Sequence, residues 1–182
     1  YSTQSVLDLL QQRPDLGVEG DVVLHVGLND CANRMFLEPE RLALDFLPPA
    51  VKERIVTFAQ KHRAAILRHL PPHHYVNPVD FARNLQEIVT LLRARKAERI
   101  LLTTIILLPS RTWPATPGLN RNFATYNLAI MTAAEELGAT LFDFDRLVWQ
   151  AGIDPSPLIE DGMHLSETGH RLFAAGCKRL LS

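Results

Sequence analysis

Ile100-Leu-Leu-Thr-Thr-Ile-Ile-Leu-Leu108 is an unbroken run of apolar and β-branched residues, and Pro109 ends it. A run of this kind, without alternation of apolar and polar positions, is typical of a strand that is buried on both faces. Such strands lie in the middle of parallel sheets. The run therefore predicts a central strand over residues 100–108 and an α/β fold built around it.

Shorter apolar runs predict two further strands, at residues 22–26 and 140–144. Apolar residues at helical spacing, together with helix-capping residues, predict the helices. We expect them at residues 2–12, 40–46, 49–69, 78–97, 122–137 and 166–181. Strands that alternate with helices favour a parallel sheet covered on both faces. Three strands are few for such a sheet, so we expect the chain to enter the fold after a first strand.

The composition is that of a folded globular protein. The length of 182 residues suits a single domain. Of these residues, 47% are hydrophobic and 21% are charged. A net charge of -1 gives no electrostatic argument for binding nucleic acid or an anionic membrane, and no apolar stretch is long enough to span a bilayer. Because the chain opens with Tyr1 and not with Met, the sequence does not decide between a cytoplasmic and an exported protein.

Asp161-Gly-Met-His164 carries the strongest chemical signal in the chain. The carboxylate stands three residues before the imidazole, on a loop that opens the last predicted helix. With this spacing the Asp161 carboxylate can bond the near ring nitrogen of His164. The far nitrogen is then held in the tautomer that accepts a proton from a nucleophile. The pair forms two thirds of a hydrolytic triad.

Gly27-Leu-Asn29-Asp30 is the second motif, and it directly follows the first predicted strand. In open α/β sheets, ligands bind beyond the carboxyl ends of the strands. A glycine there permits a tight turn, and the amide of Asn29 can then donate to a developing oxyanion. Glycine, asparagine and aspartate are also common in ordinary turns, so the motif alone leaves both interpretations open.

The two motifs together resemble those of the SGNH hydrolases, also called the GDSL esterase/lipase family. A strand ending in Gly-x-Asn-Asp is combined with Asp-x-x-His before the last helix, and the resemblance covers essentially the whole chain. It implies a three-layer α/β/α, flavodoxin-like fold. It also implies that Asn29 donates to an oxyanion hole, that His164 is the general base and acid, and that Asp161 orients His164.

Two blocks of the family pattern are not found. The family's nucleophile is a serine in a Gly-Asp-Ser motif, whereas Gly20-Asp21 is followed by Val22. The family's second block is a glycine whose N–H completes the oxyanion hole just before a helix, and Tyr1-Ser-Thr-Gln4 resembles the residues directly after it. The resemblance thus implies that both blocks, and the first strand, lie ahead of Tyr1. The nearest serines, Ser2 and Ser5, are expected to cap and open a helix.

Three explanations of the missing serine stay open. The native protein carries the segment ahead of Tyr1, or the segment is a separate chain after cleavage, or the protein is a pseudoenzyme. A sheet without its first strand would expose unpaired edges, which argues against a stable form that lacks this strand.

Residues 31–77 form a long excursion between the Asn29 motif and the next sheet-covering helix. We expect a helical insertion that either elaborates the surface or acts as a lid, because it leaves from the active-site edge of the sheet. The loop of residues 110–117 leaves the same edge, so Arg111 and Trp113 are candidate substrate contacts. Gly27 and Asp30 are further candidates for substrate binding.

The other chemically active residues are expected to be structural. Neither Cys31 nor Cys177 has the spacing of a metal site or indicates a disulfide. Cys177 fits an apolar helical pattern, whereas Cys31 follows the Asn29 motif and is a candidate for lining a pocket. His25 is expected to be a buried histidine within the first strand.

The sequence therefore predicts a serine ester hydrolase, provided that the serine precedes Tyr1. An esterase, a lipase or a carbohydrate O-deacetylase would act through an acyl-enzyme on small acyl esters or on glycan or lipid esters, with no metal or organic cofactor. The alternatives are acyl transfer to a sugar by the same residues and a non-catalytic binding module without the serine. A Gly-Asp-Ser after an apolar strand ahead of Tyr1 would favour the enzyme. The sequence predicts no oligomeric state.

Overall fold

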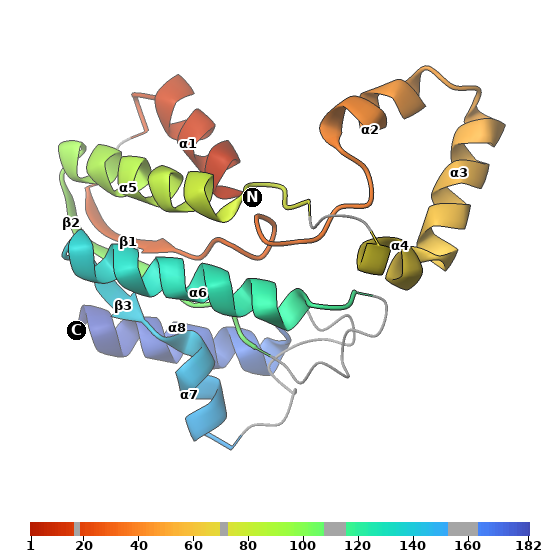
Figure 1. Ribbon diagram of the computed structural model, residues 1–182. Coiled ribbons are helices and arrows are strands. Elements are labelled where there is room, and N and C mark those ends of the chain that lie inside the picture. The colour runs from red at the N-terminus through yellow and green to blue at the C-terminus, as the bar shows by residue number, and fades with distance from the viewer. Residues whose placement is uncertain (17–18, 70–72, 108–115, 153–163) are drawn as a thin grey trace.

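In the part of the chain that the structure describes, the sheet has three parallel strands in the order β1-β2-β3 (Figure 1). The computed structural model describes residues 1–16, 19–69, 73–107, 116–152 and 164–182. Strand β1 is Gly20–Leu24, β2 is Ala97–Thr103 and β3 is Thr140–Phe142. The predicted central strand and the predicted α/β class are both confirmed.

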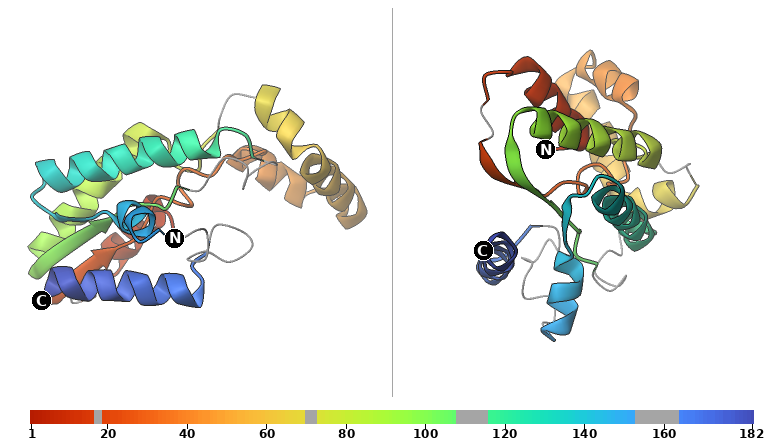
Figure 2. Two further views of the ribbon diagram at one scale, coloured as in Figure 1. Left: turned by 90° about the horizontal axis from the view of Figure 1, so that it is seen from below. Right: turned by 90° about the vertical axis from the view of Figure 1, so that its left-hand side faces the viewer.

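Helices cover both faces of this sheet (Figure 2). On one side α5 (Pro78–Ala94) packs between α1 (Thr3–Gln12) and α6 (Leu119–Glu136). On the other side α8 (Glu167–Leu181) lies against β3. The result is the three-layer α/β/α arrangement that the sequence predicts, and it leaves the carboxyl ends of the strands open at one edge.

The helix α7 (Phe144–Gln150) has no counterpart among the elements predicted from the sequence. Asp143 begins it by accepting a hydrogen bond from the Arg146 N–H at 3.2 Å. The predicted strand over residues 140–144 ends at Phe142 for this reason, because the backbone after Asp143 turns into a helix.

Strand β2 also ends before its apolar run does, at Thr103. The Asn127 side chain on α6 accepts from the Ile105 N–H at 2.7 Å and donates to the Ile105 carbonyl at 2.7 Å. The Leu107 N–H donates to the Asp145 carboxylate at 2.7 Å. Side chains therefore take up the backbone bonds that a neighbouring strand would otherwise satisfy.

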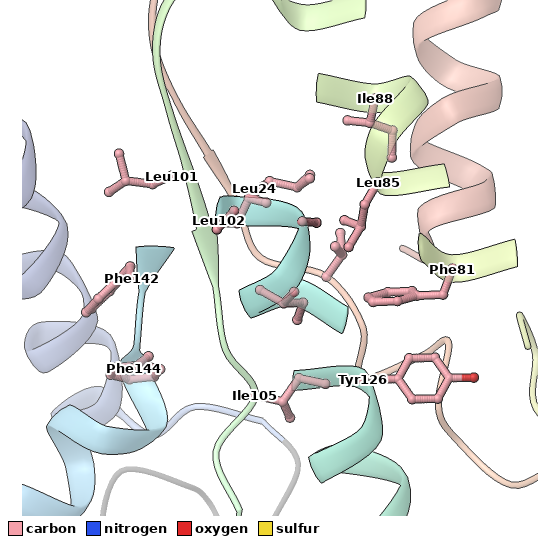
Figure 3. Close-up of a cluster of buried hydrophobic side chains, with 14 of the residues drawn as sticks. Leu24, Phe81, Leu85, Ile88, Leu101, Leu102, Ile105, Tyr126, Phe142 and Phe144 are labelled. Atoms are coloured by element: carbon pink, nitrogen blue, oxygen red, sulfur yellow. The ribbon is translucent and has the colours of Figure 1, made fainter. Parts of the chain in front are cut away.

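The core lies on both faces of β2 (Figure 3). Leu101 and Leu102 are consecutive, both are buried, and they point to opposite sides of the sheet. Leu101 lies toward Phe142, and Leu102 lies toward α5, where Leu85 and Ile88 are buried. Burial on both faces explains why the β2 sequence shows no apolar–polar alternation.

Residues 38–69 form a helical arm that projects beyond the sheet (Figure 1). It consists of α2 (Glu38–Asp45), α3 (Pro49–Lys61) and α4 (Arg63–His69). The single helix predicted over residues 49–69 is wrong, because His62 leaves helical geometry at φ -105° and ψ 15°. The next side chain, Arg63, then turns back and donates to the Asn33 carbonyl at 2.9 Å. A packing contact far away in the sequence thus divides the helix.

Strand β1 lies at the edge of the described sheet, since only β2 pairs with it among the described residues. Val23, an apolar residue of this strand, is 37% exposed. His25 differs in part from the expectation: it follows the last residue of β1 and is accessible to solvent, but its ring packs against Phe173 and burial there lowers its pKa. One side of β1 is therefore less covered than the centre of the sheet, as an edge position implies.

Candidate active site

The site begins at the turn that follows β1. Gly27 has φ 111°, a backbone conformation that residues with a Cβ rarely adopt. A Cβ built at this position would also lie 2.9 Å from Ile105 Cδ1. The Cys31 N–H closes the turn by donating to the Gly27 carbonyl at 2.9 Å. Glycine is therefore required where the chain leaves the carboxyl end of β1.

Asn29 lies on the outer side of this turn. The residue is exposed, and its Nδ2 donates to the Tyr1 carbonyl at 3.4 Å. The bond is long, so the amide is a donor that a ligand can recruit. Asn29 thus stands beside the first residue before α1, at the carboxyl edge of the sheet.

Asp30 points the other way, into the protein, where it fastens the start of α1. Its Oδ1 accepts from the Thr3 N–H at 2.8 Å and from the Thr3 hydroxyl at 2.6 Å. Asn84 on α5 donates to the same hydroxyl at 3.3 Å. Burial raises the pKa of the Asp30 carboxyl, and the two bonds from Thr3 oppose that rise. Asp30 is fully buried, so its contacts are with α1 and not with a pocket.

The far end of the insertion returns to the same turn. The N–H groups of Tyr75 and Val76 donate to the Asp30 carbonyl at 3.1 and 3.3 Å. Asn33 and His74 form an antiparallel bridge. The two ends of residues 31–77 are thereby joined beside Asn29.

A pocket with a cavity volume of about 370 Å³ opens over Asn29. Its walls come from the start of α1, from the turn after β1 and from the insertion. The described residues that line it are Tyr1, Ser2, Ser5, Asn29, Arg34, Arg41 and Tyr75. No sequence motif marks Arg34, Arg41 or Tyr75, because backbone pairing distant in the sequence brings this part of the chain here.

Ser2 and Ser5 play the roles that the sequence predicts for them. Ser2 caps α1 by accepting from the Ser5 N–H at 3.2 Å, and the Ser5 hydroxyl accepts from the Ser2 N–H at 2.8 Å. This reciprocal capping box satisfies backbone donors of the first turn. Both hydroxyls are engaged in the fold of the helix start.

His164 lies just ahead of α8 and is exposed. Ser166 caps this helix, since its hydroxyl accepts from the Gly169 N–H at 3.1 Å. Figure 1 shows α8 beginning on the side to which the carboxyl ends of the strands point. Asp161, Arg111 and Trp113 lie outside the described residues. The beginning of α8, which follows His164, thus lies on the same side of the sheet as the turn that follows β1.

Cys31 is completely buried, so it does not line the pocket as the sequence allowed. Burial and the neighbouring Asp30 raise the pKa of its thiol, which keeps the thiol protonated and unreactive. Cys177 is buried in the core, as its helical pattern predicts. Across the described ranges, histidine, cysteine and carboxylate side chains form no cluster that could hold a metal ion.

The parallel sheet and the Gly-x-Asn-Asp turn at its carboxyl edge define a hydrolase of the SGNH type. The sequence model of the GDSL-like lipase/acylhydrolase family matches residues 2–172, and the chain belongs to this family. Family membership supports an enzyme that hydrolyses ester bonds. No curated protein matches the chain. No helix within the described ranges is long and apolar enough to cross a membrane.

Solved structures share the fold at low sequence identity. One is the acetylxylan esterase Axe2 from Geobacillus stearothermophilus, with 17% identity, a TM-score of 0.58, and coverage of 97% of this chain and 67% of Axe2. Another is LAE5, an α/β hydrolase from the metagenome of Lake Arreo, Spain, with 17% identity, a TM-score of 0.62, and coverage of 98% of this chain and 67% of LAE5. The chain thus spans about two thirds of their length. Two Axe2 structures are catalytic mutants, one with a serine and one with a histidine replaced by alanine.

Proposed function

We propose that this protein is a serine ester hydrolase that works through an acyl-enzyme. The observation that carries the proposal is the position of Asn29, whose amide stands at the carboxyl edge of the sheet beside the start of α1. An amide donor at this place can stabilise the oxyanion of a tetrahedral intermediate. One such donor is worth about 100-fold to 1000-fold in kcat.

The nucleophile of the proposed reaction is a serine that precedes Tyr1 in the full-length protein. It attacks the ester carbonyl while His164 takes its proton, and His164 then returns the proton to the leaving alcohol. Water repeats the same steps to release the acid from the acyl-enzyme. Asp161 holds His164 in the required tautomer. The serine and histidine catalytic mutants of Axe2 support this division of roles.

Acetylated carbohydrates are the first substrates to test, because proteins with this fold include an esterase named for acetyl-xylooligosaccharides. Other small acyl esters and lipid esters remain within the proposed class. The insertion of residues 31–77 acts as a lid over the pocket, and Arg111 and Trp113 contact the substrate from the neighbouring loop. Gly27 supports substrate binding by shaping the turn that carries Asn29, and Asp30 by fixing α1 beside it.

Hydrolysis of p-nitrophenyl acetate by the full-length protein tests the proposal. We expect His164→Ala to lower kcat by about 10,000-fold or more, since the serine loses its general base. His170→Ala is the matched control, because His170 is an exposed histidine six residues after His164, in the first turns of α8. Equal rates for the wild type and His164→Ala would contradict the proposed role of His164 as the general base.

A second measurement separates an enzyme from a binding module. A fluorophosphonate probe reacts with activated serines, and mass spectrometry then locates the labelled residue. We expect one labelled serine ahead of Tyr1, with labelling greatly slowed in His164→Ala. Labelling of Ser2 or Ser5 instead, or no labelling of the active wild type, contradicts the proposed mechanism.

A further inference from the structure

The pocket beside Asn29 has a marked charge asymmetry. Two of its lining residues, Arg34 and Arg41, are cationic, and no acidic residue is among the described residues that line it. Arginines gathered in one concave space repel each other unless an anion lies between them. The two charges are neutralised only where acidic side chains from elsewhere in the fold reach them.

Arg34 is held firmly on one wall of the pocket. Its guanidinium lies over the ring of Tyr75, with Cζ 4.8 Å from the ring centre. Its backbone N–H donates to the His73 carbonyl at 2.8 Å. Because the Tyr75 N–H in turn donates to the Asp30 carbonyl, this wall is tied to the residue after Asn29. The guanidinium is thus preorganised next to the candidate oxyanion donor.

The hydrogen-bonding capacity of Arg34 is not used up within the described part of the chain. Its Nε is buried and has no hydrogen-bond partner there, and Arg34 forms no ion pair with a described carboxylate. A buried donor without an acceptor is unfavourable. A guanidinium offers paired N–H groups whose geometry matches a carboxylate or a phosphate.

Arg41 lines the pocket from α2 and forms no ion pair with a described carboxylate. Asp45, one turn further along α2, binds Lys52 Nζ at 2.6 Å. Glu40 accepts from the Leu37 N–H at 2.8 Å. The insertion therefore brings a second arginine to the pocket, and two acids on its helix make their described bonds to other groups.

Arg63 adds to the positive charge behind Arg34. It donates to the Asn33 carbonyl and to the Thr116 hydroxyl, at 2.9 and 3.2 Å, and neither acceptor carries a charge. Burial lowers the pKa of Arg63, and the charge of Arg34 lowers it further. Neither of these two acceptors neutralises the charge of Arg63.

We infer that this pocket binds a carboxylate or phosphate group of the substrate, with Arg34 as its main ligand and Arg41 as a second one. The inference rests on the proposed ester hydrolysis and narrows its substrates to esters that carry an oxyanion group close to the reacting carbonyl. Arg34 and Arg41 are then specificity-determining residues, and the insertion supplies both of them.

Matched esters test this specificity on the full-length protein. The substrates are 4-acetoxybenzoate, its neutral counterpart 4-acetoxybenzamide, and 4-acetoxyphenyl phosphate. We expect the wild type to prefer the anionic esters, and Arg34→Gln to lower the anionic-to-neutral ratio of kcat/KM about tenfold or more. Arg34→Lys should retain part of the preference, because it keeps the charge and loses the paired geometry. The preference should also fall as salt is added.

Arg179→Gln is the matched control, because Arg179 is an exposed arginine near the end of α8 and does not line the pocket. Its anionic-to-neutral ratio should equal that of the wild type. The two anionic esters show which group the pocket prefers, and a higher ratio for either supports the inference. Two results would overturn the inference. One is a wild-type kcat/KM for 4-acetoxybenzamide that equals the values for both anionic esters. The other is an anionic-to-neutral ratio of Arg34→Gln that equals the wild-type ratio.

A binding measurement keeps the inference separate from the proposed reaction. Nuclear magnetic resonance of the arginine Nε–H groups is followed while benzoate, and then benzamide, is titrated. We expect benzoate to shift the Arg34 signal and benzamide to leave it unchanged. Absence of ester hydrolysis together with a benzoate-specific shift overturns the proposed function and supports the anion site. No benzoate-specific shift of the Arg34 signal overturns the anion site, whatever the activity.

Discussion

At the scale of single residues, the buried carboxylate of Asp30 does most to assemble the site. One of its oxygens accepts both donors of Thr3, and its second oxygen is buried with no partner among the described residues. Burying a carboxylate is costly unless it is well bonded. The bonds from Thr3 offset part of this cost. They also join the turn after β1 to the start of α1, across 27 positions of sequence.

Removal of the Thr3 hydroxyl tests this junction. In Thr3→Val the carboxylate loses its shortest bond and Asn84 loses an acceptor, while the side chain keeps its shape. We expect the free energy of unfolding, measured with urea, to fall by about 1 to 3 kcal/mol. Thr90→Val is the control, since the Thr90 hydroxyl only donates to Gln86 within α5 on an exposed surface. Equal stabilities of the two variants would contradict the role of the junction.

The raised pKa of Asp30 gives a pH dependence with a definite sign. Its folded-state pKa lies above its unfolded value because of burial, so the folded state binds the proton more tightly. Its contribution is fully present below the unfolded pKa and is lost as the pH rises through the folded pKa. We therefore expect the wild type to gain stability relative to Asp30→Asn as the pH falls from about 7 to about 4.

Urea unfolding of both proteins across this pH range measures the effect. The difference between the wild type and Asp30→Asn isolates one group, because all other titrations occur in both proteins. Asp8→Asn is a control on α1, where the carboxylate accepts a single bond from Gln4 at the surface. A difference that stays constant, or that grows as the pH rises, would show that Asp30 is not the titrating group.

At the scale of elements, local sequence predicted what local forces decide. Asn77 caps α5 and Pro78 begins it, as expected for such a helix start. The β2 run is central because its residues are apolar on both faces. The division of the helix at His62 depends on the bond from Arg63 to Asn33, and the early end of β2 depends on the bonds between Asn127 and Ile105. Local periodicity carries no signal of these distant contacts. The Asn29 turn was recognisable, whereas its tie to Thr3 was not.

The turn after β1 is the element whose geometry the site needs most. Gly27→Ala adds strain from a φ of 111° and places a Cβ against Ile105. We expect the free energy of unfolding to fall by about 1 to 3 kcal/mol. Gly152→Ala is the control, because Gly152 has φ 63° and open space at its Cβ, so only backbone strain is added.

The double variant Gly27→Ala with Ile105→Val separates the two causes. Removal of Ile105 Cδ1 relieves the contact and leaves the backbone strain. The double variant should thus be more stable than the sum of the two single changes predicts. Strict additivity in thermal or urea unfolding would show that the contact does not matter.

At the scale of the whole molecule, the protein divides into a tightly packed sheet layer and the arm of residues 38–69. In α5, six of the residues are buried, including Phe81, Leu85 and Ile88. In α3, Ala59 is the buried residue among those the structure describes, while Phe58 is 63% exposed. Segments with few buried contacts open at a lower free energy than the core. The arm is therefore the part of the fold best suited to move over the pocket.

Hydrogen exchange measured by mass spectrometry tests this division. We expect amides of α2 and α3 to exchange on the order of 100-fold faster than those of α5, because local opening of the arm leaves the core intact. Since Arg41 lies on α2 and faces the pocket, benzoate should slow exchange in α2 in the wild type. Benzoate should slow exchange in α2 less in Arg41→Gln than in the wild type. It should leave the exchange of α5 unchanged in both proteins. If the amides of α3 are as protected as those of α5, the arm is part of the rigid core. The insertion then does not work as a lid that closes on the substrate.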